Sequence, residues 1–195
     1  LAAFANEGIL EAGLDEAGRG PMFGPVYVAA CILPQDDSFD HSLIRDSKKL
    51  TKKKISELSP LIKEISSAWS LGQSSAKEID SIGIREATEH AMLRSLQRLP
   101  IQLKLVLVDG NLPIRCWEGN QKTIINGESH SASIAAASVI AKNARDNLIK
   151  RIANQFPEYG LINHVGYGTD FHRKAIKLHG PSKLHRQTFL SKIMV

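Results

Sequence analysis

The chain has 195 residues, of which 43% are hydrophobic and 23% charged, and this composition excludes a disordered, fibrous or disulfide-scaffold protein. A domain of this length buries about 70% of its unfolded surface, so it needs neither a metal nor a disulfide to fold. The net charge of +5 lies entirely in residues 151–195, which hold seven basic and two acidic side chains, and this segment predicts an anionic partner.

The sequence contains no run of 18 apolar residues and no signal-peptide pattern at its start, so we expect no contact with a membrane. Cys31 and Cys116 lie in apolar segments without CxxC spacing, which predicts reduced core thiols. No additional apolar stripe indicates a dimer. We therefore expect a cytoplasmic monomer without an obligate protein partner.

Strand and helix patterns alternate along the chain without a repeat or linker, so we expect one α/β domain over 1–195, with 151–195 packed on it as a basic substrate-binding tail. Residues 9–16 and 25–33 predict two strands of a hairpin, joined by a turn rich in glycine and proline at 18–21.

Thr51 is the expected N-cap of a helix to about Leu58, where Pro60 either kinks the helix or starts a second piece that ends near Ser66. The remaining expected elements follow from the apolar spacing and the positions of glycine and proline. They are a strand over 68–73, an amphipathic helix over 85–99, a buried strand over 101–108, a long helix over 131–156 and a short helix over about 170–178.

Acidic residues interrupt two of these apolar strands. Asp15 and Glu16 directly follow Leu14, and Asp109 directly follows Val108. Each site alone is typical of a strand cap or a turn. Because strand ends converge on one rim of an α/β sheet, where ligands bind, we expect the three carboxylates to meet there.

Clustered carboxylates need cations or protons between them, since two such charges about 4 Å apart repel by roughly 4 kcal/mol at an effective dielectric constant of 20. Mg²⁺ and Mn²⁺ prefer oxygen ligands. Between carboxylates and a phosphodiester they form a two-metal site, in which one ion generates a hydroxide and the other stabilises the leaving oxygen.

Glu128 and Asp146 are the alternatives for a fourth acid. Asp146 lies more than about 20 Å along the long predicted helix from its N-terminal end, so both cannot reach one metal pair. Asp146 also stands beside Arg145, which is typical of an ion pair or a rim residue. We therefore expect Glu128, in the loop before that helix, to be the fourth carboxylate.

Several motifs in this order resemble those of the type 2 ribonucleases H (ribonuclease HII) over nearly the whole chain. The motifs are GLDEAGRGP at 13–21 with Gly24-Pro25, DSKKL at 46–50, DGN at 109–111, IAAAS at 134–138 with Ala141-Lys142 and Arg145-Asp146, GYGT at 166–169, and His185-Arg186 with Phe189.

The resemblance implies a ribonuclease-H-like α/β fold, with a mixed five-stranded sheet flanked by helices and a C-terminal segment of helices and loops. It implies an endonuclease that hydrolyses the RNA strand of RNA/DNA hybrids. It further implies incision on the 5′ side of ribonucleotides embedded in duplex DNA, leaving 3′-hydroxyl and 5′-phosphate ends.

By the same resemblance, Asp15, Glu16 and Asp109 match the catalytic, metal-binding acids of the family, and the implied cofactor is two Mn²⁺ or Mg²⁺ ions with substrate bound. Glu128 stands where the family usually has Asp after Gly. Glutamate carries the same charge on a side chain one methylene longer, so we expect Glu128 to keep a supporting role in catalysis and metal binding.

The loop Gly18-Arg19-Gly20 is by itself typical of a tight turn. Glycines also let backbone groups approach a ligand closely, and a 2′-hydroxyl both donates and accepts hydrogen bonds. In the family this loop reads the ribose, and the tyrosine that matches Tyr167 stacks on the neighbouring sugar or base. Val165 departs from the family, which more often has Lys there.

Basic side chains are expected to bind phosphates without reading sequence. Lys52, Lys53 and Lys54 indicate only a solvated helix face. For His172 and His185 we expect a hydrogen-bonded structural role or a phosphate contact more than proton transfer. The expected phosphate-binding residues are Ser47, Lys48 and Lys49 in a loop, and Arg173, Lys174, Lys177, Lys183 and Arg186 in the tail.

Three alternatives stay open. Ribonuclease HIII shares the acidic framework, but it typically has a further N-terminal domain and lacks Arg in the first glycine loop, so Arg19 favours type 2. Another ribonuclease-H-like nuclease, such as a resolvase or transposase core, does not explain the glycine loop together with Tyr167. A binding module that uses the basic tail alone does not require acids at strand ends.

Overall fold

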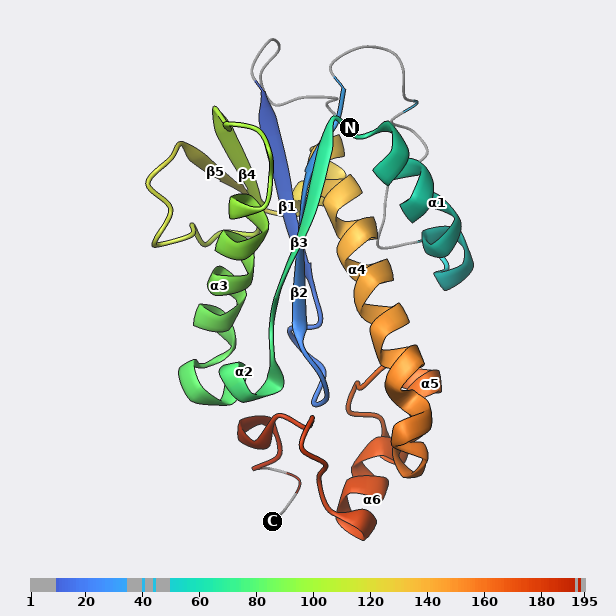
Figure 1. Ribbon diagram of the computed structural model, residues 1–195. Coiled ribbons are helices and arrows are strands. Elements are labelled where there is room, and N and C mark those ends of the chain that lie inside the picture. Colours follow the sequence, from blue (N-terminus) through green and yellow to red (C-terminus); the bar gives the residue numbers. More distant parts are fainter. Residues whose placement is uncertain (1–9, 35–39, 41–43, 45–49, 192, 194–195) are drawn as a thin grey trace.

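The computed structural model describes residues 10–34, 40, 44, 50–191 and 193. Ser47 and Lys48, two of the predicted nucleic-acid-binding residues, and the neighbouring Lys49 lie outside the described residues. The centre of the fold is a five-stranded sheet in the order β3-β2-β1-β4-β5 (Figure 1). Its strands are β1 (Glu11–Ala17), β2 (Val26–Ile32), β3 (Ala68–Ser74), β4 (Leu105–Asp109) and β5 (Gln121–Ile124).

The sheet is mixed, as predicted. β1 pairs with β2 and β2 with β3 in antiparallel fashion, which confirms the predicted hairpin. β1 pairs with β4 and β4 with β5 in parallel. The predicted strand over 101–108 begins only at Leu105, because its pairing with β1 begins where Leu105 lies opposite Glu11.

Helices cover both faces of the sheet (Figure 1). α1 (Lys52–Ile65) and α4 (Ala132–Ile152) pack on one face, and α2 (Ala76–Ile82) and α3 (Ile84–Gln97) on the other. α5 (Leu161–His164) and α6 (Asp170–His179) lie beyond one end of the sheet. The sequence did not predict α2 or β5.

Local signals set the helix ends. The Thr51 hydroxyl accepts from the N–H of Lys54 at 3.2 Å, which confirms the predicted N-cap, and α1 continues through Pro60 as one helix. Ser131 caps α4 in the same way. α4 ends at Ile152, four residues earlier than predicted, where the 3-10 turn η4 (Ala153–Gln155) begins.

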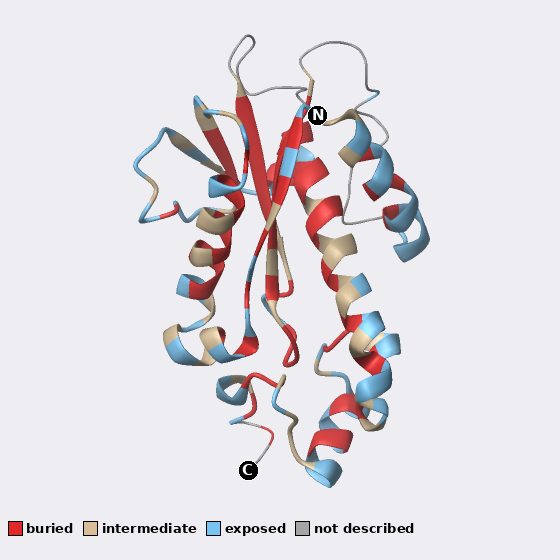
Figure 2. Ribbon diagram, viewed as in Figure 1, coloured by how far each residue is buried: buried red, intermediate tan, exposed pale blue. Residues whose placement is uncertain are grey.

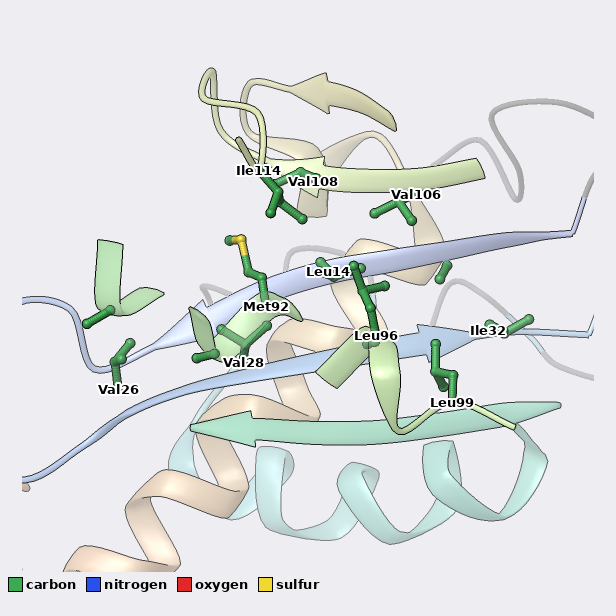
Figure 3. Packing of buried hydrophobic residues seen from close by; sticks show 14 of the residues in the cluster. Leu14, Val26, Val28, Ile32, Met92, Leu96, Leu99, Val106, Val108 and Ile114 are labelled. Carbon is green, nitrogen blue, oxygen red and sulfur yellow. The ribbon is translucent and has the colours of Figure 1, made fainter. Parts of the chain in front are cut away.

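The core lies on both faces of the sheet, and the strands are mostly buried while the outer helix faces are exposed (Figure 2). On the α3 side, Leu14, Val28 and Val108 meet Met92 and Leu96 (Figure 3). Alternate residues of β1 point to opposite faces, as expected for a strand. The residues next to Leu14 therefore face α4.

The two cysteines are free, but only one lies in the core. Cys31 is buried on β2, whereas Cys116 is exposed in the connection between β4 and β5. The prediction of two core thiols is therefore wrong for Cys116, because the apolar residues around it belong to a surface connection.

The C-terminal segment has its own apolar cluster. Ile176, Tyr159 and Leu190 from this segment pack around Met22 and Phe23 of the β1–β2 connection. This cluster brings the tail against the end of β1. Within the described part of the chain, no helix is long and apolar enough to cross a membrane.

Gly13 sets the distance between β1 and α4. A Cβ atom at Gly13 would lie 2.2 Å from the backbone carbon of Ser133 and 2.3 Å from the nitrogen of Ile134. Alanines on α4, such as Ala136 and Ala137, are fully buried beside it. The helix can therefore lie directly on the strand that carries Asp15.

We predict that Gly13→Ala lowers the free energy of unfolding by about 3 kcal/mol, because α4 must move away from β1 to accept the methyl group. Urea denaturation followed by circular dichroism measures this change. Lys53→Ala, at an exposed position of α1, is the control and is expected to stay within about 0.5 kcal/mol. An unchanged stability for Gly13→Ala would contradict the close packing described here.

Candidate active site

Two neighbouring parallel strands carry the first three predicted acids to one rim. The pairing of β1 and β4 runs up to Leu14 opposite Val108. The next residues, Asp15 on β1 and Asp109 at the end of β4, therefore lie on neighbouring strands. Glu16 follows Asp15 on β1. The topology thus brings together the carboxylates that the strand-end pattern predicted.

The segment after β5 brings the fourth predicted acid to the same rim. Asn126 has a left-handed backbone conformation with φ of 53°, which asparagine adopts more readily than most residues, and it opens the 3-10 turn η3 (Gly127–Ser129). The N–H of Gly127 donates to Oδ1 of Asp109 at 2.6 Å. This bond joins the turn to the end of β4 and places the buried Glu128 beside it.

A cavity of about 700 Å³ joins these acids to the other predicted elements. It is lined by all four predicted acids, by the loop Gly18-Arg19-Gly20 and by Tyr167. One face of α4 forms another part of the lining, through Ser138, Lys142 and Asp146, which are spaced four residues apart. Of these three residues, only Asp146 was weighed as a site residue, although all three belong to the motifs of the resemblance.

Asp146 lines the same cavity as Glu128, although we expected only one of the two acids to reach the site. α4 runs along the cavity, so a residue far from its N-terminus still borders it. Oδ1 of Asp146 lies 3.9 Å from Nη1 of Arg145. Asp146 is thus both ion-paired and on the rim, as its sequence context indicated.

Burial and like charges act together on the acids of β1. Burial raises the pKa of Asp15 well above its ordinary value, and the charges of Glu16 and Asp109 raise it further, while a hydrogen bond from Ser138 opposes them. Burial also raises the pKa of Glu16, against the opposing effect of Arg19, whose Nη1 lies 3.3 Å from Oε1 of Glu16. The acids at the rim therefore favour the binding of a proton or a cation.

The donors at this rim fit a hard divalent cation. They are carboxylate oxygens from separate elements that face one cavity, and their mutual repulsion is relieved by a cation. As the described side chains lie, no three His, Cys, Asp or Glu residues are grouped closely enough to form a ready metal site. The fit therefore rests on the chemistry of the donors and on their common cavity.

Arg186 is placed differently from the prediction of a phosphate contact. It is fully buried, and its guanidinium donates to the carbonyls of Gly18 at 2.6 Å, Arg19 at 2.9 Å and Gly24 at 2.9 Å. A guanidinium enclosed in this way does not reach a nucleic acid. We therefore assign Arg186 a structural role, in which it holds the glycine loop in place.

Arg145 has the same kind of position on the other side of the loop. Its side chain is 1% exposed and donates to the carbonyls of Phe23, Pro25 and Val165 at 3.0–3.1 Å. A Cβ at Gly18, where φ is 93°, would lie 2.0 Å from its Nε. This position therefore needs glycine both for its φ and for contact with Arg145.

Other basic residues divide between surface and cavity. Lys52 is exposed at the start of α1, as predicted for a solvated helix face, but it also lines the cavity, and its Nζ donates to the carbonyl of Asn163 at 3.3 Å. The other described tail cations predicted to bind phosphate are exposed. They are Arg173, Lys174, Lys177 and Lys183.

Comparison with known proteins extends these observations. The family model described as Ribonuclease HII matches residues 12–192. A protein named Ribonuclease HII from Prochlorococcus marinus is 58% identical over 184 residues, which cover 93% of this chain and 96% of the relative.

Two solved structures share the fold. The ribonuclease H2 from Pyrococcus horikoshii OT3 has a TM-score of 0.77 at 25% identity, over 94% of this chain and 96% of that chain. Bst-RNase HIII, solved in complex with Mn²⁺, has a TM-score of 0.79 at 20% identity, over the whole of this chain and 72% of that one.

We predict that Asp15→Asn lowers the cleavage rate by at least about 100-fold, since even an outer-shell partner of a metal site typically contributes 10–100-fold. The same change is expected to stabilise the protein. The folded-state pKa of Asp15 is raised, so its ionisation costs stability as the pH rises from the ordinary value of 3.8 through the folded value, and the full cost applies above it.

Melting temperatures without added metal measure the second effect. At pH 8 we expect Asp15→Asn to melt about 2–4 °C higher than the wild type for each kcal/mol by which burial and like charges penalise the Asp15 carboxylate. The difference is expected to shrink as the pH falls toward 3.8. A variant that melts lower than the wild type at pH 8 would count against a buried, repelled carboxylate at this position.

Proposed function

The chain belongs to the ribonuclease HII family and is therefore an endoribonuclease that acts on the RNA strand of RNA/DNA hybrids, and from this premise we propose that it also incises duplex DNA at single embedded ribonucleotides. Incision falls on the 5′ side of the ribonucleotide and leaves 3′-hydroxyl and 5′-phosphate ends. The enzyme acts in the cytoplasm as a monomer without an obligate protein partner.

The observation that carries this proposal is the shared cavity. An acidic rim from β1, β4 and η3 faces the same space as a glycine loop and an exposed tyrosine. The acids suit phosphodiester hydrolysis, and the loop with the tyrosine suits recognition of a sugar. A generic nuclease needs only the first of these two parts.

Asp15, Glu16, Asp109 and Glu128 are the residues that would hold two divalent ions, Mg²⁺ or Mn²⁺, in the presence of substrate. When bound, these ions supply an activated water and stabilise the charge on the leaving oxygen. Asp15 and Asp109 leave adjacent paired strands, so their spacing is fixed by the sheet. Glu128 is positioned through the bond between Gly127 and Asp109.

The glycine loop presents backbone N–H groups to the substrate. Arg186 binds the carbonyls of Gly18 and Arg19, so these carbonyls point into the protein. In a trans peptide the N–H points opposite to the C=O, so the N–H groups of Arg19 and Gly20 point away from Arg186. These donors suit the oxygen of a ribose 2′-hydroxyl, which a deoxyribose lacks.

One experiment separates the candidate functions. The protein is incubated with Mg²⁺ or Mn²⁺ and a DNA duplex that contains one ribonucleotide, beside an all-DNA duplex and an RNA/DNA hybrid. We expect incision of the first and third substrates only. Binding without incision would favour a binding module, and cleavage of the all-DNA duplex would favour a generic ribonuclease-H-like nuclease.

We predict that Tyr167→Ala reduces cleavage at a lone ribonucleotide at least about tenfold more than cleavage of a continuous hybrid. Stacking of an aromatic side chain on a base contributes about 1–3 kcal/mol. A hybrid offers ribose at neighbouring positions as well, and contacts to these sugars compensate in part for the lost Tyr167 contact. Initial rates on the two substrates, measured with the same enzyme preparation, give the ratio.

Phe171→Ala is the matched control for this prediction. Phe171 is also an exposed aromatic residue, 61% exposed against 49% for Tyr167, but it does not line the cavity. We expect its removal to leave both rates within about twofold. Equal losses on both substrates for Tyr167→Ala would remove Tyr167 from ribonucleotide selection.

A further inference from the structure

Two buried histidines connect the Tyr167 segment to the end of the tail. His172 on α6 is 0% exposed and His185 is 1% exposed. Their Nε2 atoms lie 3.0 Å apart, so one ring donates and the other accepts. The contacts of the two Nδ1 atoms decide which ring donates.

At one end, Nδ1 of His185 lies 2.9 Å from both the backbone nitrogen and the hydroxyl oxygen of Ser182. The hydroxyl can donate or accept, so the backbone N–H is the contact that fixes the role of Nδ1. A backbone N–H only donates, so this Nδ1 accepts and carries no proton. The neutral His185 ring therefore carries its proton on Nε2 and donates it to His172.

At the other end, Nδ1 of His172 lies 2.9 Å from the carbonyl oxygen of Tyr167. A carbonyl only accepts, so His172 carries its proton on Nδ1 and accepts at Nε2. Both ends therefore require the same direction through the two rings. Each ring has one permitted tautomer, and a proton added to either ring would set two donors against each other.

We propose that His172 and His185 form a one-way hydrogen-bond chain, from the N–H of Ser182 to the carbonyl of Tyr167, which positions Tyr167 toward the sugar of the substrate. His172 and His185 are positioning residues, since neither lines the cavity. The link to the substrate rests on the proposed function of Tyr167. The hydrogen-bond chain between Ser182 and Tyr167 does not depend on that function.

The Tyr167 peptide group depends on such anchoring. Tyr167 lies between two glycines, and its side chain is 49% exposed at the cavity. Its backbone N–H donates to the carbonyl of His164 at 3.0 Å, and its carbonyl also accepts from the N–H of Thr169 at 2.9 Å. The bond from His172 is thus the one contact from a side chain to this peptide group that the structure shows within the described residues.

The surroundings keep both rings neutral. The rings of Phe23 and Tyr159 meet His185 edge-on at centroid distances of 5.0 and 4.6 Å, and His164 stacks on His172 at 4.6 Å. Burial lowers the pKa of both His172 and His185 to about 4. At neutral pH neither ring is charged, as the chain requires.

The nitrogen-15 spectrum of the histidine side chains tests the hydrogen-bond chain directly. At pH 7 we expect His172 as the Nδ1–H tautomer and His185 as the Nε2–H tautomer. Another tautomer or a charged ring at either position would overturn the proposal. This measurement uses the wild-type protein without substrate, so its outcome is independent of the proposed function.

Two variants of His172 test positioning. Asparagine and leucine have nearly the same shape, but only the asparagine amide can donate to the Tyr167 carbonyl in place of Nδ1–H. We expect His172→Leu to lower the ratio of lone-ribonucleotide to hybrid cleavage about tenfold, and His172→Asn to keep it within about threefold. Tenfold corresponds to about 1.4 kcal/mol, the upper range for one hydrogen bond.

The reverse order, with leucine retaining selectivity and asparagine losing it, would show that His172 acts only by apolar packing. Equal ratios for both variants and the wild type would overturn the positioning of Tyr167 by His172. If the wild type cleaves no lone ribonucleotide, the proposed function fails while the tautomers still decide whether the chain is present.

Discussion

Two buried positive charges hold the parts of the site together. A buried guanidinium is stable only when its donors are satisfied, and Arg145 and Arg186 meet this requirement chiefly with backbone carbonyls. These carbonyls belong to the connection after β1 and to the segment before Tyr167. The glycine loop and the tyrosine are therefore fixed relative to one another by the same pair of side chains.

One member of the pair, Arg186, belongs to the basic segment 151–195. Burial and the neighbouring charge of Arg145 lower the pKa of Arg186 to about 9. Arg186 does not line the cavity, whereas Arg145 and the acids of β1 and β4 do. Part of the basic excess of the tail is thus structural, because Arg186 is buried, whereas the cations of α6 are exposed.

The sequence was sufficient for features that depend on topology, and insufficient for features that depend on burial. Asp15 and Asp109 could be predicted because acids after apolar strands meet wherever those strands are neighbours in a parallel pair. β5 was not predicted, because this strand has only four residues and none of them is fully buried. Whether Arg186 is a surface or a buried cation depends on tertiary contacts with Gly18 and Gly24, which no local pattern encodes.

The route of the chain through the site has a consequence for the order in which the enzyme is made. Asp15 is synthesised before Asp109, whose strand pairs with that of Asp15 although 94 residues separate the two acids, and Arg186 follows 77 residues after Asp109. Long-range pairings of this kind form late in folding. A nascent chain therefore contains all four acids of the rim before Arg186 is available to hold the glycine loop.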